Sequence, residues 1–206
     1  MSLRGRLFAK TYDRMMAKAE KAGLHAMRQS VLSDATGRVL EIGAGTGANI
    51  ALYGPQVTSL TLTEPEAPML KRLERRVAAE SSSASVVQAP AEKLPFENAS
   101  FDTVVSTLVL CGVEDQARAL SEIRRVLRQG GTLIFLEHVR SDDEKVARFQ
   151  DRMNGVNRFV VGCNCNRATL AAIKSAGFEV GRLDHHTLPK SPKFVRPSIA
   201  GTATAP

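Results

Sequence analysis

Tryptophan is absent from this 206-residue chain, aromatic residues make up only 5% of it, and there are three cysteines. An odd, small number of cysteines does not build a disulfide framework and fits a reducing cytoplasm. Aromatic residues this sparse also argue against a surface that stacks on unpaired bases. The longest uncharged apolar stretch, residues 104–113, is about half of what a membrane-spanning helix requires. We therefore expect a chain that is neither exported nor membrane-spanning.

Acidic residues are the minority among the charges, with 21 against 28 basic residues and a formal net charge of +7. This balance favours anionic partners, or it is simply a solvated basic face. Nucleic acid is not expected as a partner, because the run at 106–110 lacks the turn that grips a flipped base. Peripheral contact with an anionic membrane stays open, since basic residues are dense near the N-terminus. Those residues are Arg4, Arg6, Lys10, Arg14, Lys18, Lys21 and Arg28.

The composition, 43% apolar and 24% charged, is typical of a single globular domain, here residues 1–206. After residue 38, short apolar runs alternate with helical patterns, as in βαβ units around a parallel sheet. One helix is expected to be capped by Asp115 and closed by Gly130. Strands are expected near residues 38–42, 57–63, 84–88, 103–108 and 132–138.

The two ends of the chain read differently from this core, which spans residues 38–140. Residues 1–30 read as an amphipathic helical cap that is free to fold over the ligand crevice. In the C-terminal part, residues 166–206, a short helix to residue 176 precedes segments 179–187 and 194–204, which should pair as an antiparallel edge hairpin. The apolar stretch 141–165 is either a lid over an acceptor or an extra core helix. The expected fold is α/β, with a mostly parallel seven-stranded sheet and helices on both faces.

A glycine-rich turn is the sharpest local signal. The apolar strand from Val39 runs directly into Gly43-Ala44-Gly45-Thr46-Gly47. Gly43, Gly45 and Ala48 match the spacing of nucleotide-binding turns, and Glu64 lies about twenty residues on, where an acid binds ribose hydroxyls. This spacing fits both a nicotinamide dinucleotide and S-adenosylmethionine.

Two features favour S-adenosylmethionine. Glu41 is an acid inside an otherwise apolar strand, which is costly without partners and serves no purpose in a dinucleotide site. The glycines at 43, 45 and 47 let the backbone approach a compact amino-acid tail and leave a helix N-terminus for its carboxylate. An NAD-linked oxidoreductase is the alternative from another class, although the chain has no Tyr-x-x-x-Lys pattern.

The run from 39 to 49 resembles the first motif of class I S-adenosylmethionine-dependent methyltransferases. The runs AEKLPF at 91–96, FDTVV at 101–105 and EIRRVLRQGG at 122–131 resemble successive motifs of the menaquinone and ubiquinone ring methyltransferase-like branch. A narrower similarity is to the thiol S-methyltransferases. It lies in TLVLC at 107–111, LEHV at 136–139, GC at 162–163 and VRPSIAG at 195–201.

The resemblance implies a Rossmann-like class I methyltransferase fold that binds S-adenosyl-L-methionine and releases S-adenosyl-L-homocysteine. It places the glycine turn around the methionine part of the cofactor, Glu64 on the ribose, Ala91 and Glu92 beside adenine, and Thr107 near the amino group. Tyr12 would close over the cofactor. The cofactor-binding residues predicted in this way are Tyr12, Glu41, Gly43, Ala44, Gly45, Gly47, Asn49, Glu64, Pro65, Ala91, Glu92, Thr107 and Leu108.

The sulfonium of such a cofactor is already activated, so positioning and desolvation can supply most of the rate. Glu137 and His138 are the candidate catalytic residues, because they follow the fifth expected strand at the crevice rim. Neighbours on a strand face opposite sides, so only one should face the acceptor. We expect His138 as a base or an orienting residue; the alternative is a structural histidine. His185 and His186 are weaker candidates.

No metal site is expected, because Cys163 and Cys165 flank a single residue with no second pair. The predicted function is methyl transfer to a small, apolar acceptor, which is a thiol, a quinol or phenol, or a ring carbon. A phospholipid amine at a membrane surface is the alternative acceptor. The sequence leaves the acceptor atom and the oligomeric state open.

Overall fold

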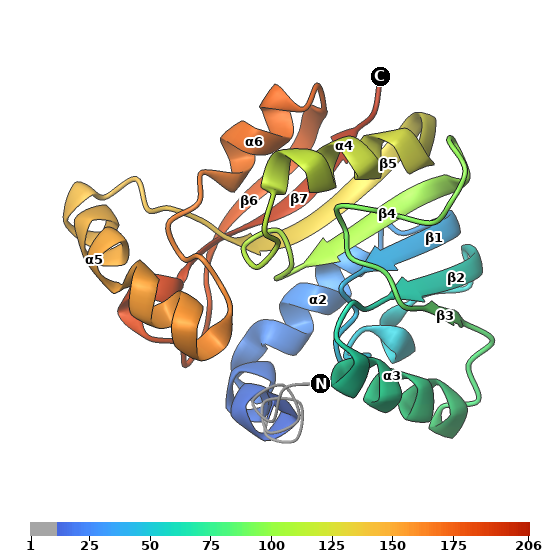
Figure 1. Ribbon diagram of the computed structural model, residues 1–206, viewed down its shortest axis with the longest axis horizontal. Helices are drawn as coiled ribbons and strands as arrows, with labels where there is room; N and C mark the ends of the chain where they lie inside the picture. The colour runs from blue at the N-terminus through green and yellow to red at the C-terminus, as the bar shows by residue number, and fades with distance from the viewer. Residues whose placement is uncertain (1–11) are drawn as a thin grey trace.

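The computed structural model describes residues 12–206 and shows one seven-stranded sheet (Figure 1). Its strand order is β3-β2-β1-β4-β5-β7-β6. The first five strands run parallel, and β7 is antiparallel to both β5 and β6. This confirms the predicted fold class, including the antiparallel C-terminal hairpin. The strands are β1 (Gly37–Ile42), β2 (Val57–Thr63), β3 (Ser85–Val87), β4 (Phe101–Thr107), β5 (Leu127–His138), β6 (Glu179–Thr187) and β7 (Pro197–Thr204).

Helices cover both faces of the sheet because the central strands are apolar on both sides. In β5, Leu133 and Phe135 pack with α4 and α6 on one face, and Ile134 and Leu136 pack with α2 on the other (Figure 1). The helices are α2 (His25–Leu32), α3 (Ala67–Ala79), α4 (Gln116–Val126), α5 (Glu144–Val161) and α6 (Thr169–Ser175), with a π-helical turn η1 (Glu20–Leu24) and 3-10 turns η2 (Ile50–Leu52) and η3 (Lys193–Val195).

The start of α4 is as predicted, but its end is not. The Asp115 side chain accepts a hydrogen bond from the Arg118 backbone N–H at 3.0 Å, which confirms the N-cap. The expectation that Gly130 closes this helix is wrong. Leu127 already pairs with Phe101 in the sheet, so the chain enters β5 directly after α4, and Gly130 lies inside that strand.

The N-terminal segment contributes to the core as well as to the crevice. Residues 1–11 of the predicted cap lie outside the described part of the chain. Helical structure runs from residue 12 to Leu32 and is kinked at Gly23, where φ is 134°. Leu24, Val31 and Leu32 are buried against the sheet. The C-terminal part of this segment is therefore packed on the sheet, and it holds the helical residues that precede it near the crevice.

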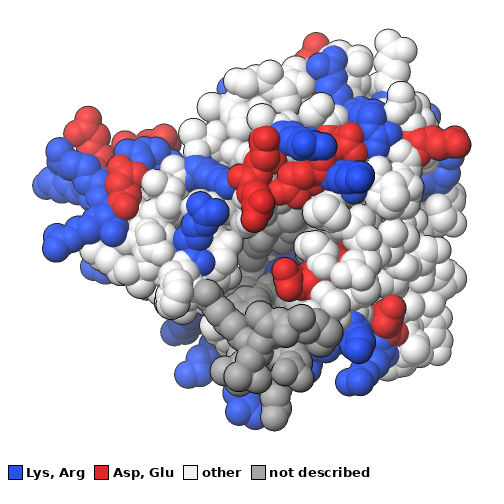
Figure 2. Space-filling view, in the orientation of Figure 1, with Lys and Arg blue, Asp and Glu red and all other residues white. Residues whose placement is uncertain are grey.

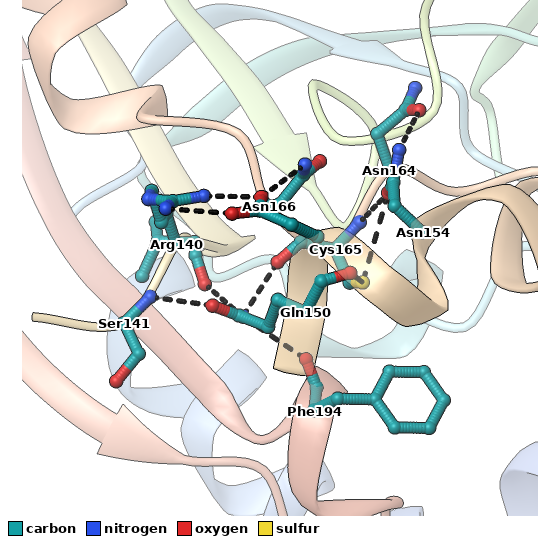
Figure 3. Close-up of polar contacts among 10 residues, drawn as sticks. Arg140, Ser141, Gln150, Asn154, Asn164, Cys165, Asn166 and Phe194 are labelled. Atoms are coloured by element: carbon teal, nitrogen blue, oxygen red, sulfur yellow. Dashed lines mark hydrogen bonds and ion pairs between the residues drawn. The ribbon is translucent and has the colours of Figure 1, made fainter. Parts of the chain in front are cut away.

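Helix α5 turns polar side chains inwards and apolar side chains outwards. Gln150 and Asn157 are buried on its inner side. Gln150 Nε2 donates to the carbonyl oxygens of Val139, Cys165 and Phe194 at 2.7 to 3.1 Å (Figure 3). The exposed side chains include Phe149, Val156, Phe159, Val160 and Val161. Core packing of this apolar face, one of the two alternatives for residues 141–165, is not what the structure shows.

Within residues 12–206, no helix is long and apolar enough to cross a membrane.

Candidate active site

The glycine turn follows β1 and lies at the carboxyl ends of the parallel strands. Gly43, Gly45 and Gly47 have φ angles of 54°, 60° and 84°, in the left-handed region that glycine favours. A Cβ at Gly43 would meet Val109 at 2.8 Å, and one at Gly47 would meet Ile50 at 2.6 Å. The turn is thus compact because glycine allows it, which leaves the backbone accessible to a ligand.

Glu64 lies directly after β2 and faces this turn. Its two carboxylate oxygens accept one hydrogen bond each, from the backbone N–H groups of Gly45 and Glu66, both at 2.9 Å. Burial raises the pKa of the Glu64 carboxyl above its usual value. A carboxylate has about four acceptor positions, so both oxygens keep capacity for a pair of hydroxyl donors. This is what the ribose of an adenosyl cofactor offers.

Glu41 lies behind the turn, as part of a buried polar network. Its carboxylate accepts from Asn49 Nδ2 at 2.9 Å and from the Tyr53 hydroxyl at 2.7 Å. Burial raises the pKa of the Glu41 carboxyl to about 7, against these two donors and the nearby Arg28 charge. Asn49 also donates to the Thr107 hydroxyl at 3.0 Å. Glu41 and Asn49 thus support the turn from inside, which is consistent with the sequence argument that a buried acid here needs partners.

Arg28 is the residue of this buried network that the sequence analysis did not single out. This buried arginine of α2 donates through Nη1 to Asn49 Oδ1 at 3.1 Å and to Thr107 Oγ1 at 3.0 Å. Its Nε donates to Glu20 at 3.0 Å. In the sequence, Arg28 is only one of several N-terminal basic residues, because no local pattern indicates that α2 packs on the crevice. It joins the N-terminal segment to the ends of β1 and β4.

Glu137 holds the turn that follows β4. It is fully buried, and its carboxylate accepts from the Ser106 hydroxyl at 2.6 Å and from the backbone N–H groups of Val109, Leu110 and Cys111 at 3.0 to 3.4 Å. Leu108, at the start of this turn, has a φ of 60°. The geometry makes Glu137 a positioning residue for the turn and does not direct it towards an acceptor.

His138, the other candidate, meets two cysteines from distant segments. Its Nδ1 lies 3.2 Å from Cys163 Sγ, and Cys111 completes a group whose ligand atoms all lie within 4.8 Å of one another. The Cys111 thiol and the His138 ring, both near Cys163, lower the pKa of the Cys163 thiol, whereas the pKa of Cys111 is raised by its hydrogen bond with Cys163 and by burial. Cys165 is buried outside this group.

Two further loops reach the same edge of the sheet. The Glu92 carboxylate accepts from the Glu114 N–H at 2.7 Å, which ties the loop predicted to lie beside adenine to the loop before α4. Ala91 is buried next to it. The Gln88 side chain donates to the Pro65 carbonyl at 2.9 Å.

The N-terminal helix is fastened to the glycine turn. Thr46 Oγ1 donates to Asp13 Oδ1 at 2.6 Å. Tyr12 lies beside Asp13, and burial raises the pKa of its hydroxyl. This segment therefore lies against the glycine turn, and the closure of Tyr12 over the cofactor stays a prediction. By contrast, His185 and His186, the weaker catalytic candidates, are exposed on β6 at the edge of the sheet.

Comparison with known proteins agrees with this arrangement. Residues 40–135 match the methyltransferase domain family. The chain is 32% identical over 201 residues to thiol S-methyltransferase TMT1A of Homo sapiens, covering 95% of this chain and 82% of that protein. It is 32% identical to phosphatidylethanolamine N-methyltransferase of Cereibacter sphaeroides, over 61% of this chain and 66% of that protein. Among solved structures, an S-adenosylmethionine-dependent methyltransferase from Thermotoga maritima superposes with a TM-score of 0.74, at 24% identity and over 98% of each chain.

The chain belongs to the S-adenosylmethionine-dependent methyltransferases of class I, and it is an enzyme that transfers a methyl group to a small acceptor. S-adenosylmethionine is its cofactor. The residues present fit that cofactor, because the compact glycine turn lies against a buried Glu64 carboxylate with acceptor capacity to spare. The NAD-linked alternative is not supported by these comparisons.

Proposed function

We propose that the enzyme methylates the sulfur of a small, apolar thiol. The similarity to thiol S-methyltransferase TMT1A supports this, because it extends over 95% of the chain. The matched part thus reaches beyond the common domain of residues 40–135 and into α5 and the C-terminal hairpin. Acceptor preference in such folds depends on loops and added segments of this kind.

S-adenosylmethionine, when bound, supplies a methyl group on a sulfonium that leaves readily. The chain then has to orient the two reactants and exclude water. We assign Glu64 to the ribose and Glu137 to holding the turn of residues 108–111 on the acceptor side. We assign His138 to orienting the acceptor, with its ring held by Cys163 at 3.2 Å. A thiol with a pKa near 8.5 is already partly ionised at neutral pH, so it needs less help than a phenol.

Matched acceptors test this proposal. Thiophenol and phenol differ only in the atom that receives the methyl group, so we would compare them at equal concentrations with methyl-deuterated cofactor and mass spectrometry. A quinol and phosphatidylethanolamine vesicles complete the panel, and Glu64→Ala is the negative control. We expect methyl thioether formation at a kcat/KM at least about 100-fold above that of phenol. Methylation of the quinol or the amine without the thiol, or cofactor binding with no turnover, would reject the proposal.

We also infer that the enzyme contacts an anionic membrane surface through α5. The exposed residues Phe149, Val156 and Val160 recur at helical spacing on its outer side, at 44%, 56% and 60% exposure. Such a face, flanked by basic residues, is typical of helices that lie in the membrane interface. Figure 2 shows basic side chains, with acidic ones among them, at the left, where Figure 1 places the start of α5. Those of α5 are Lys145, Arg148, Arg152 and Arg158.

A membrane position would bring lipophilic thiols to the enzyme. It would also suit a phospholipid amine, the second candidate acceptor, which the similarity to phosphatidylethanolamine N-methyltransferase favours. We place this reaction in the cytoplasm, a reducing compartment. This location suits the three cysteines, which are free thiols in the structure.

Vesicle flotation tests the proposed membrane contact of α5. Binding to vesicles with anionic lipid should weaken steeply as salt rises, and the double variant Val156→Ser, Val160→Ser should bind more weakly at every salt concentration. The matched control is His185→Ser, His186→Ser on the edge strand. Binding that ignores both salt and the α5 change would contradict the inference.

A further inference from the structure

Cys111, His138 and Cys163 come together from three separate segments. Cys111 lies in the turn after β4, His138 is the last residue of β5, and Cys163 follows α5. Their sulfur and nitrogen atoms all lie within 4.8 Å of one another, and the His138 Nδ1 to Cys163 Sγ distance is 3.2 Å. Both cysteines are buried. None of these three pairings is visible as a spacing in the sequence.

Hydrogen bonds to the main chain hold Cys111 and Cys163 in place, and His138 pairs with Ser198 in the sheet. The Cys111 N–H donates to Glu137 at 3.4 Å, and the Cys111 carbonyl accepts from the Asn164 N–H at 2.8 Å. The Cys163 carbonyl accepts from Asn157 Nδ2 at 2.6 Å. The group is therefore a preformed arrangement on rigid elements, which is what a binding constellation requires.

We propose that Cys111, His138 and Cys163 form a three-ligand site for a thiophilic divalent cation, with Zn²⁺ as the best fit. Two thiolates and an imidazole are the donor set that zinc prefers, and the two thiolates balance its charge inside the protein. Zinc–sulfur bonds of about 2.3 Å and zinc–nitrogen bonds of about 2.0 Å in a tetrahedron place the ligand atoms about 3.5 to 3.8 Å apart. The observed atoms need to move only slightly to reach these separations. Binding releases both thiol protons to solvent.

Three protein ligands leave one tetrahedral position open, as in catalytic zinc sites. The group lies at the carboxyl ends of β4 and β5, the edge where such sheets bind ligands. An acceptor thiol would enter the open position as a thiolate and lose its proton to solvent. Its sulfur lone pair then forms the new bond to the methyl carbon while the sulfonium–methyl bond breaks and its electron pair stays on the cofactor sulfur. This role rests on the proposed function, whereas metal binding does not.

Metal titration of the full-length, reduced, metal-stripped protein tests the site directly. We expect one equivalent of Zn²⁺ to bind, and Co²⁺ in its place to give a thiolate-to-cobalt charge-transfer band. Cys163→Ser and His138→Ala should weaken Zn²⁺ binding at least about 100-fold, since even the loss of an outer partner costs 10- to 100-fold. Cys165→Ser is the matched control, because Cys165 is as buried but lies outside the group, and it should bind like the wild type.

Several outcomes would overturn the metal site. They are no Zn²⁺ uptake by the reduced wild type, Co²⁺ binding without a charge-transfer band, and equal uptake by all variants. A Cys111–Cys163 disulfide whose reduction yields thiols that take no metal would overturn it too. The cobalt spectrum needs no variant, so it decides even where a substitution prevents folding. S-adenosylhomocysteine binding by each variant shows that its fold is kept.

The role of zinc in activating the acceptor thiol is tested separately from zinc binding. Thiophenol methylation is measured in metal-free and zinc-loaded enzyme, and we expect at least a tenfold higher rate with zinc. An equal rate in the metal-free enzyme would overturn the role of the ion and leave the proposed function standing. Zinc binding with no thiol methylation at all would reject the proposed function while the metal site remained.

Discussion

Three buried glutamates, at the carboxyl ends of β1, β2 and β5, have different hydrogen-bond partners. Glu41 accepts from Asn49 and Tyr53 behind the glycine turn, Glu64 faces the turn with acceptor capacity to spare, and Glu137 accepts from a hydroxyl and three backbone N–H groups. Burial raises the pKa of each. What distinguishes them is therefore their hydrogen-bond partners, and of the three Glu64 is the one suited to a ligand.

Replacing Glu64 by glutamine should weaken cofactor binding and leave the fold intact. Hydrogen bonds to a charged group are each worth about 1.5 to 3 kcal/mol, so we expect the Kd for S-adenosylhomocysteine to rise about 10- to 100-fold in calorimetry. Glu66→Gln is the matched control, because this neighbouring acid is exposed and the substitution keeps the backbone N–H that donates to Glu64. Unchanged affinity in Glu64→Gln would remove the ribose assignment.

Glu41 should make the folded protein less stable as the pH rises. Its pKa is about 7 in the folded state against 4.5 ordinarily, so between these values the folded chain holds a proton that the unfolded chain releases. The stability that this provides is complete below about pH 4.5 and is lost as the pH rises towards 7. Glu41→Gln removes the effect.

Urea unfolding of wild type and Glu41→Gln at pH 5 and pH 8 measures it. The free energy of unfolding of the variant, relative to the wild type, should increase by about 2 to 3 kcal/mol between the two pH values. Because the two proteins share every other titrating group, the contributions of those groups cancel in the difference between the two free energies of unfolding. A difference that does not vary with pH would mean that the Glu41 carboxyl titrates normally.

Residues that depend on local pattern could be predicted, and those that depend on distant contacts could not. That Glu64 would lie against the glycine turn could be predicted, because an acid after the second strand has a fixed place in such sheets and because glycine favours the backbone of this turn. The contact of Glu64 with the ribose stays a prediction. Arg28 and Thr107 meet across 79 positions, and Cys111 meets Cys163 only because α5 returns to the end of β4. No local pattern in a single sequence indicates these long-range contacts.

At the scale of the element, α5 is inverted relative to an ordinary surface helix. Its polar side faces chain segments whose carbonyl groups need donors, at Val139, Cys165 and Phe194. Its apolar side faces outwards. The sequence predicted an apolar segment at 141–165, but not which side would be buried, because hydrophobicity alone favours the opposite orientation. A role as an acceptor lid stays a prediction.

Substituting Gln150 by leucine should destabilise the protein even though leucine is apolar and similar in size. The change leaves three carbonyls and the Ser141 N–H without this partner, at about 1 to 3 kcal/mol for each unsatisfied group that water does not reach. We expect a loss of about 2 to 4 kcal/mol in urea unfolding. Val156→Ser, on the exposed side of the same helix, should stay within about 0.5 kcal/mol of wild type. The opposite ranking would mean that the outer side of α5 is the one that stabilises the fold.

At the scale of the whole molecule, the site is assembled from the ends of strands that are far apart in sequence but adjacent in the order β2-β1-β4-β5. The N-terminal helix joins them through Arg28 and through the Thr46–Asp13 hydrogen bond. The strand positions and the antiparallel hairpin could be predicted because each strand is a short apolar run bounded by turns. The insertion of β7 between β5 and β6 follows from pairing that the sequence leaves unspecified.

A ligand that bridges these strand ends stabilises the whole sheet, since it binds the folded chain only. At a concentration 100 times its Kd, S-adenosylhomocysteine should add about 2.7 kcal/mol, which for a chain of this length raises Tm by about 5 to 10 °C. Differential scanning fluorimetry with S-adenosylhomocysteine, S-adenosylmethionine and NADH measures this shift. NADH should give none, and Glu64→Gln should need about 10 to 100 times more adenosyl ligand for the same shift. A rise in Tm with NADH equal to that with S-adenosylhomocysteine would mean that the glycine turn does not discriminate between the two cofactor classes.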